Sequence, residues 1–240
     1  MYILLDSNVT AGYYLPRSLH SVRARERIEN IFDSVRSGET SHFFYLPNFC
    51  VAEVFSVFMK HSFGAWNAHV KKKGTIDTRV YNSLVAQFQD DIHNGKFIYH
   101  YELSRYHVLG MNLVAPVDHY YRIYKGSKKT VAPMGTFDHL IISMGVHLAH
   151  IHGKDNVVLL STDDRLTNIL KKCCMGLSHE TKKKLKLDNA ESVTGKRFEP
   201  ATFPRGINLK NTTKNELEAT FGVWPLPVGK IPPMYRWLKV

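Results

Sequence analysis

Residues 157–164 read Val-Val-Leu-Leu-Ser-Thr-Asp-Asp, an apolar run that ends in two acids. Four consecutive apolar residues without alternation are typical of a strand buried on both faces, as strands of parallel sheets are. The chain opens on a similar run, Tyr2–Leu5, which is followed by Asp6. Two further short runs, at residues 43–46 and 97–99, complete a set of four predicted strands.

Helical patterns separate these predicted strands. Apolar side chains recur at helical spacing in residues 18–35, 48–63, 80–92, 104–124 and 137–152. Thr136 stands where the N-cap of the last helix is expected. Strands that alternate with helices predict an α/β fold of three layers, α/β/α, with a central and mainly parallel sheet. Ligands of such sheets bind at the carboxyl ends of the strands.

The charge of the chain points to a polyanionic partner. Its 240 residues include 32 basic and 21 acidic side chains, a net charge of +11. Residues 165–240 carry fifteen basic and six acidic side chains, so +9 of that charge lies in the C-terminal third. A basic surface attracts the phosphates of a nucleic acid without reading its sequence. We therefore expect a nucleic-acid partner, with solubility as the alternative explanation of the charge.

Three further features of the sequence argue against a membrane-spanning, secreted or disulfide-stabilised protein. No apolar run approaches the roughly 18–20 residues that a membrane-spanning helix needs. Residues 1–8 lack the basic leader of a secretory signal. The three cysteines, Cys50, Cys173 and Cys174, are too few and too badly spaced for a disulfide framework. We expect a soluble, cytoplasmic protein.

Four acids stand where the predicted fold could gather them. Asp6 and Asp163 each follow a predicted strand, Asp138 lies in the first turn of a helix, and Glu53 lies one to two turns into another. Carboxylates beside apolar core residues are costly unless they are paired or bind a cation. Few basic residues lie near these acids in the sequence. Because oxygen-only ligands suit Mg²⁺ or Mn²⁺, the sequence predicts a divalent metal site.

Around these acids the sequence resembles the PIN-domain nucleases, which include the toxin ribonucleases of bacterial toxin–antitoxin pairs. The resemblance lies in residues 4–9 (LLDSNV), 46–54 (LP, then VAEV), 136–142 (TFDHLII) and 159–166 (LLSTDDRL). It implies a PIN-like nuclease domain over residues 1–172. We expect residues 173–240 to form a basic extension that contains prolines and aromatic residues and packs on the domain. Its aromatic residues could instead form a dimer contact or stack on bases.

The resemblance implies a Mg²⁺- or Mn²⁺-dependent endoribonuclease that hydrolyses RNA phosphodiester bonds, either as a toxin or in RNA processing. A toxin would have an antitoxin protein as a partner, and a homodimer is also compatible with the sequence. The residues that the resemblance assigns to catalysis and metal binding are Asp6, Glu53, Asp138 and Asp163. Asn8 and Thr162 would position these acids, and Asp164 is an alternative to its neighbour Asp163.

We expect the basic segment that begins at Arg165 to contact RNA. Residues 165–197 hold nine basic and three acidic side chains, and they include the run Lys182, Lys183 and Lys184. The alternative is a solvated helix face. The stretch from Glu53 to Asp138, which includes residues 65–130, is longer than in compact toxins, and this leaves the RNA target open.

Each acid alone also has a structural interpretation. Asp6 could be a turn residue, Asp138 a helix-start residue, and Asp163 the cap of the helix that begins near Arg165. A catalytically inactive RNA-binding or scaffold protein with the PIN fold is therefore the main alternative. A flap-type DNA nuclease is a second one, although the larger acidic set and helical arch of that class are not visible.

A zinc site is not predicted. His147 and His150 are three residues apart on one helix, with His152 just beyond, but no third clustered ligand accompanies them at a recognised spacing. We interpret these histidines as structural or solvated. In the extension, residues 213–216 (TKNE) match a capping box, which predicts a short helix closed by Gly222.

Overall fold

Five strands form one sheet in the part of the chain that the structure describes. The computed structural model describes residues 1–16, 22–63, 76–93, 95, 97–123, 133–188, 195, 199 and 202–231. All five strands run parallel, in the order β3-β2-β1-β4-β5. This confirms the predicted α/β class, with a parallel sheet flanked by helices. The strands are β1 (Tyr2–Leu5), β2 (Phe43–Pro47), β3 (Ile98–Tyr101), β4 (Val157–Ser161) and β5 (Arg205–Asn208).

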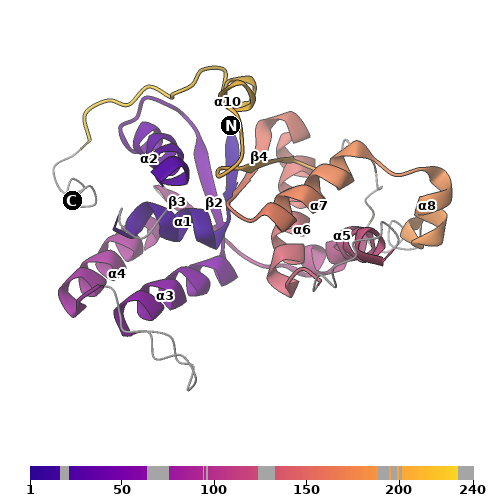
Figure 1. The fold of residues 1–240 in the computed structure, drawn as a ribbon, viewed down its shortest axis with the longest axis horizontal. Coiled ribbons are helices and arrows are strands. Elements are labelled where there is room, and N and C mark those ends of the chain that lie inside the picture. Colours follow the sequence, from indigo (N-terminus) through magenta and orange to yellow (C-terminus); the bar gives the residue numbers. More distant parts are fainter. Residues whose placement is uncertain are drawn as a thin grey trace. The chain divides into compact units, whose positions relative to one another are not determined.

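Helices occupy most of the other described residues (Figure 1). They are α1 (Ser7–Tyr14), α2 (Val22–Arg36), α3 (Asn48–Phe63), α4 (Thr78–His93), α5 (Arg105–Ile123), α6 (Thr136–His152), α7 (Asp164–Met175), α8 (His179–Lys184) and α10 (Lys214–Phe221). A helix is predicted over residues 18–35, and its first residues, 18–21, lie outside the described residues. Across the described ranges, none of these helices has the length and apolar character that crossing a bilayer requires.

The chain divides into two compact units. The first unit combines Met1–Leu4 with Glu102–Asn208, and the second combines Leu5–Tyr101 with Leu209–Val240. This division does not follow the expected one at residue 172. Strand β5, which lies in the expected extension, belongs to the first unit and pairs with β4 along its whole length.

Aromatic side chains fill the core of the second unit. The ring of Phe32 in α2 lies 4.5 Å from that of Tyr13 in α1 and 4.7 Å from that of Phe44 in β2. Phe88 of α4 meets Tyr14 of α1 edge to face at 5.3 Å. Each of these side chains is almost fully buried, and burying one such ring stabilises the fold by about 2–3 kcal/mol. The rings thereby hold α1, α2 and α4 against β2.

A buried ion pair crosses the same core. Arg36 of α2 donates from Nη1 to Oδ1 of Asp91 in α4 at 2.9 Å, and its guanidinium lies 3.9 Å from the ring centre of Phe97. The hydroxyl of Tyr14 donates to Oδ2 of Asp91 at 2.6 Å. Burial, with the charge of Asp91, raises the pKa of Tyr14 well above its usual value, so this tyrosine stays a donor. A buried carboxylate needs such partners, and this one joins three helices.

Helices α5 and α6 are the most closely packed pair within the first unit. Gly110 of α5 faces Ser143 of α6 so closely that a Cβ on the glycine would overlap Oγ of the serine. Oγ of Ser143 donates to the carbonyl of His107 at 2.6 Å. Beside this pair, every residue of β4 is buried, as the uninterrupted apolar run predicts.

Three local features differ from what the sequence predicts. Helix α1 is not expected, because seven of its eight residues are buried and no polar face marks a helical stripe. Strand β5, Arg-Gly-Ile-Asn, is not expected either, because it lacks an apolar run and is defined by its pairing with β4. Thr136 is the first residue of α6 and not its N-cap, which is Gly135.

Candidate functional site

Asp6 follows β1 and stands at the N-cap of α1. Its backbone carbonyl accepts from the N–H groups of Val9 and Thr10, but its side chain makes no capping bond to the helix. The carboxylate instead accepts from Oγ of Ser7 at 3.3 Å and from Nδ2 of Asn8 at 3.4 Å. Only 6% of Asp6 is exposed. Its two sequence neighbours therefore hold the carboxylate in a nearly buried position.

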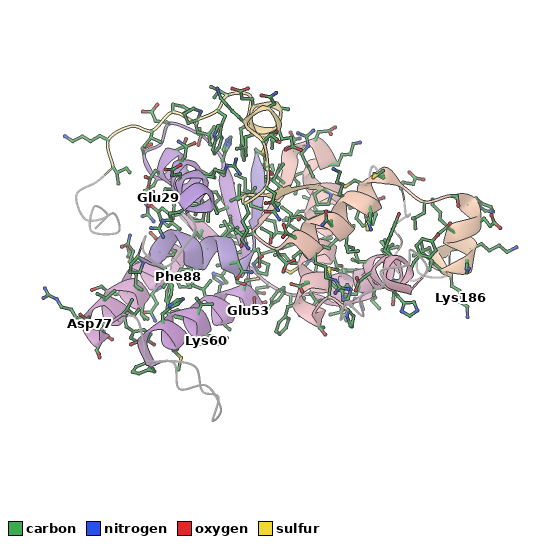
Figure 2. The ribbon with its side chains drawn as sticks, in the orientation of Figure 1. Glu29, Glu53, Lys60, Asp77, Phe88 and Lys186 are labelled. Atoms are coloured by element: carbon green, nitrogen blue, oxygen red, sulfur yellow. The ribbon has the colours of Figure 1, made fainter. Side chains whose placement is uncertain are left out.

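Glu53 reaches the surroundings of Asp6 from α3, which packs against α1. The connecting residue is Cys50, one turn before Glu53 and fully buried. Burial raises the pKa of the Cys50 thiol well above its usual value, and the charges of Asp6 and Glu53 raise it further. The charges of two of the four predicted acids therefore act on one buried thiol within the second unit. Figure 2 shows Glu53 in the first half of α3, the half that follows β2, and Lys60 nearer the end of the helix.

Asp138 lies in the first turn of α6 and is half-buried. Its Oδ2 accepts from the backbone N–H of Gly135 at 3.0 Å. An acid at this position satisfies a backbone donor at the helix start, and its charge interacts favourably with the helix dipole. Asp138 thus has a structural role that needs no metal.

Asp163 is the N-cap of α7. Its Oδ1 accepts from the N–H groups of Arg165 at 2.6 Å and Leu166 at 2.9 Å. Its own N–H donates to Oγ of Ser161, the last residue of β4, at 2.9 Å. Ser161 thus fixes the backbone of Asp163, and the role that the resemblance implies for Thr162 stays a prediction. Capping occupies one carboxylate oxygen of Asp163.

Asp164 has a different neighbour. It is exposed, and its Oδ1 accepts from Nδ2 of Asn208 in β5 at 2.8 Å. Nδ2 of Asn208 also lies 3.3 Å from Oγ1 of Thr167. The two adjacent acids therefore act differently, since Asp163 begins α7 and Asp164 ties that helix to β5.

Asp118 of α5 is a functional candidate that the sequence analysis missed. It is 2% exposed. Its Oδ1 accepts from Nη2 of Arg165 at 2.9 Å, and its Oδ2 accepts from the N–H of Met134 at 3.0 Å. Nε2 of His139 lies 3.3 Å from Oδ2 but outside hydrogen-bonding geometry. A single acid inside a helix, far along the chain from its partners, carries no pattern that would single it out.

The charge states of this cluster follow from its contacts. Burial would raise the pKa of Asp118, but the bonds from Arg165 and Met134 outweigh burial and hold the pKa below its usual value. Burial lowers the pKa of His139 despite the nearby carboxylate. At neutral pH the cluster is thus an ionised aspartate, a neutral histidine and an arginine. Arg165, expected to contact RNA, is engaged with Asp118, although 27% of its side chain is exposed.

The predicted RNA-binding lysines lie together on α8. Lys183 and Lys184 are exposed and Lys182 is half-buried. Ser178 caps this short helix, its Oγ accepting from the N–H of Thr181 at 3.2 Å. Cations in the last turn of a helix are favoured by its dipole. The sequence run therefore becomes a compact group of positive charge, and Figure 2 shows Lys186 just beyond it.

The histidines of α6 make structural contacts. Nδ1 of His147 lies 3.1 Å from Nε2 of His107 in α5, and His152 stacks on Tyr2 with ring centres 3.6 Å apart. His150 is exposed. These contacts agree with the structural interpretation of the three histidines.

Across the described ranges, no group of three or more His, Cys, Asp or Glu side chains is arranged to hold a metal ion. The four predicted acids are divided between the units, with Asp6 and Glu53 in the second and Asp138 and Asp163 in the first. Their donor atoms, all carboxylate oxygens, suit Mg²⁺ or Mn²⁺. The complete four-carboxylate site stays a prediction.

Comparisons with protein-family models, with curated proteins and with solved structures find no match. The likeness to PIN-domain nucleases therefore rests on the short segments around the four acids. A parallel α/β sheet alone assigns neither a family nor a function.

Proposed function

We propose that the protein is a Mg²⁺- or Mn²⁺-dependent endoribonuclease that hydrolyses RNA phosphodiester bonds, as PIN-domain nucleases do. The observation that carries the proposal is the pair Asp6 and Glu53, which come from different elements and both act on the buried thiol of Cys50. Both side chains end in carboxylate oxygens, the donors that Mg²⁺ and Mn²⁺ prefer. This pair is the core of the proposed cation site.

Each residue of the proposed site has a role in binding the cation or the RNA. Within the second unit, the carboxylates of Asp6 and Glu53 would hold the cation, and Asp138 and Asp163 stay predicted ligands. A bound Mg²⁺ or Mn²⁺ supplies a more acidic water and neutralises charge that develops on the phosphate. Ser7 and Asn8 fix the direction of the Asp6 carboxylate through their hydrogen bonds. The lysines of α8 would hold the RNA backbone, in keeping with the net charge of +11.

Cleavage of labelled single-stranded RNA tests this proposal. We expect cleavage with Mg²⁺ or Mn²⁺, none with EDTA, and a loss of at least about a hundredfold in rate for Asp6→Asn and for Glu53→Gln. Asp90→Asn and Glu102→Gln are matched controls, because both acids are exposed, and they should cleave normally. RNA that stays intact with the wild-type protein and either metal would contradict the proposal.

One observation favours the alternative of a catalytically inactive RNA-binding protein. Asp138 and Asp163 each already have a structural role, since each accepts backbone hydrogen bonds at the start of a helix. If these acids only begin helices, the wild-type protein and the Asp6→Asn variant should bind RNA equally and leave it intact. The cleavage assay, run beside a binding assay, decides between the two functions.

A further inference from the structure

A pocket of about 510 Å³ opens within the second unit. Three elements form it: the start of α3, the end of α4, and β3. Its lining residues are Asn48, Val51, Gln89, Ile92, His93 and His100. Pockets of roughly 300–1,000 Å³ are typical of small-molecule sites, so this one has room for a nucleotide.

The pocket lies where parallel sheets bind their ligands. Asn48 is the first residue of α3 and directly follows β2, and His100 stands one residue before the end of β3. The two strands are parallel and in register, with Leu46 beside His100. The pocket therefore includes residues from the carboxyl ends of β2 and β3, and this is the edge at which open α/β sheets hold ligands.

The chemistry of the lining selects among ligands. Asn48 and Gln89 contribute two carboxamides, each with donor and acceptor atoms, while His93 and His100 contribute two imidazoles. Among the described residues, the lining contains no carboxylate, lysine or arginine, so these residues offer no permanent charge to a metal ion or a bare anion. Planar rings with a mixed donor and acceptor edge fit it, since carboxamides pair with base edges and histidines stack on bases.

The polar members of the lining are accessible. Asn48, Gln89, His93 and His100 are all exposed. The ring centres of His100 and Tyr99 lie 5.9 Å apart, with planes 14° from parallel. These exposed rings and carboxamides can meet a ligand that enters from solvent.

We propose that this pocket binds one nucleobase of a single-stranded RNA. His100 stacks on the base, the carboxamides of Asn48 and Gln89 bond to its edge, and Val51 and Ile92 contact its apolar surface. The proposal deepens the ribonuclease function and rests on it for the identity of the natural ligand. It adds a place where the RNA is held by a base and not by its phosphates.

Binding of the four nucleoside 5′-monophosphates AMP, GMP, CMP and UMP, measured by calorimetry in EDTA, tests the pocket without any cleavage. We expect at least one of them to bind, and Gln89→Ala and His100→Ala to weaken that binding about tenfold. Asn48→Ala should do the same, but it also changes the start of α3, so the other two variants decide. Asn168→Ala and His119→Ala remove an exposed amide and an exposed imidazole elsewhere and should change nothing.

Two results would overturn the pocket proposal. One is equal nucleotide affinity in the wild-type protein and the pocket variants, and this includes the case in which none of the four binds. The other is full competition by inorganic phosphate, which would make the site an anion site. The ribonuclease function is judged separately, because nucleotide binding without RNA cleavage would refute that function and leave the pocket standing. RNA cleavage by the wild-type protein, together with equal nucleotide binding by the wild type and the pocket variants, would refute the pocket and leave the ribonuclease function standing.

Discussion

Nη2 of Arg165 donates to Oδ1 of Asp118 across 2.9 Å, and this bond joins the first turn of α7 to the middle of α5. The other oxygen of Asp118 accepts from the N–H of Met134, just before α6 begins. One buried carboxylate therefore contacts the starts of both helices that carry predicted metal ligands of the first unit, Asp138 and Asp163. Asp118 thereby links the starts of α6 and α7.

The first prediction follows from this contact. Asp118→Asn keeps the shape of the side chain but removes the charge opposite Arg165, and we expect it to lower the free energy of unfolding by about 2–4 kcal/mol. The pKa of Asp118 is lowered in the folded protein, so its stabilisation is present above the pKa of an unfolded aspartate and is lost as pH falls through the folded value. The gap between wild type and variant should therefore shrink in strong acid. Urea unfolding at neutral pH and below pH 4 measures both effects.

Asp155→Asn is the matched control for this experiment, because Asp155 is an exposed acid of the same unit. It should unfold like the wild type at both pH values. An Asp118→Asn variant as stable as this control at neutral pH would show that the buried carboxylate does not hold the two helix starts.

The second prediction separates the two roles of Asp163. Asparagine caps helices about as well as aspartate, so Asp163→Asn should keep the bonds to the N–H groups of Arg165 and Leu166 and the wild-type stability. Asp163→Ala loses the cap and should cost about 1 kcal/mol. If Asp163 is a metal ligand, both variants lose RNA cleavage. Asp164→Asn, whose side chain bonds to β5, should keep it.

Thermal unfolding and the cleavage assay together measure this prediction. Normal cleavage by Asp163→Asn would leave Asp163 with its capping role alone and would remove it from the proposed metal site.

The strands and long helices could be predicted because their signals are local. The apolar run of β4 is buried along its whole length, and the stripe of α2 faces the core. Helix α1 gives no such signal, because almost every residue in it is buried. Strand β5 is formed by pairing with β4, a partner far away in the sequence.

In the candidate site too, sequence predicts the local features and not the tertiary contacts. Sequence places Asp6 after a strand and Glu53 in a helix, and the effect of both charges on the thiol of Cys50 depends on how α1 packs on α3. The helix-start roles of Asp138 and Asp163 were among the structural interpretations that sequence allowed. Asp118 could not be found, because its three partners are brought to it by tertiary packing alone.

The third prediction concerns His42, which precedes β2. Both of its ring nitrogens are buried without a hydrogen-bond partner among the described residues, and burial lowers its pKa to about 4. An unfolded histidine takes up its proton near pH 6.5, so the unfolded state binds more protons between pH 6.5 and 4 and stability falls as the pH drops through that window. His42→Leu removes the imidazole and therefore its contribution to the loss of stability in acid.

Urea unfolding at pH 7 and pH 5 tests this prediction. The variant should be at least as stable as the wild type at pH 7, because it removes two unsatisfied polar atoms. Between pH 7 and pH 5 it should lose about 1 kcal/mol less than the wild type, a figure discounted because the ring is only partly buried. His119→Leu, at an exposed histidine, should follow the wild type. Identical pH dependence for all three proteins would contradict the lowered pKa of His42.

The fourth prediction tests whether α8 contacts RNA. Replacing Lys182, Lys183 and Lys184 by glutamine removes three charges from one short helix, and each lost phosphate contact lowers the salt dependence of single-strand binding by about 0.7. The slope of log affinity against log salt should therefore fall by about 2, with weaker binding at low salt. The matched control replaces the scattered, exposed Lys60, Lys154 and Lys230 by glutamine, an equal change in net charge. If both triple variants bind RNA alike, the attraction belongs to the net charge of the chain and α8 is not an RNA contact.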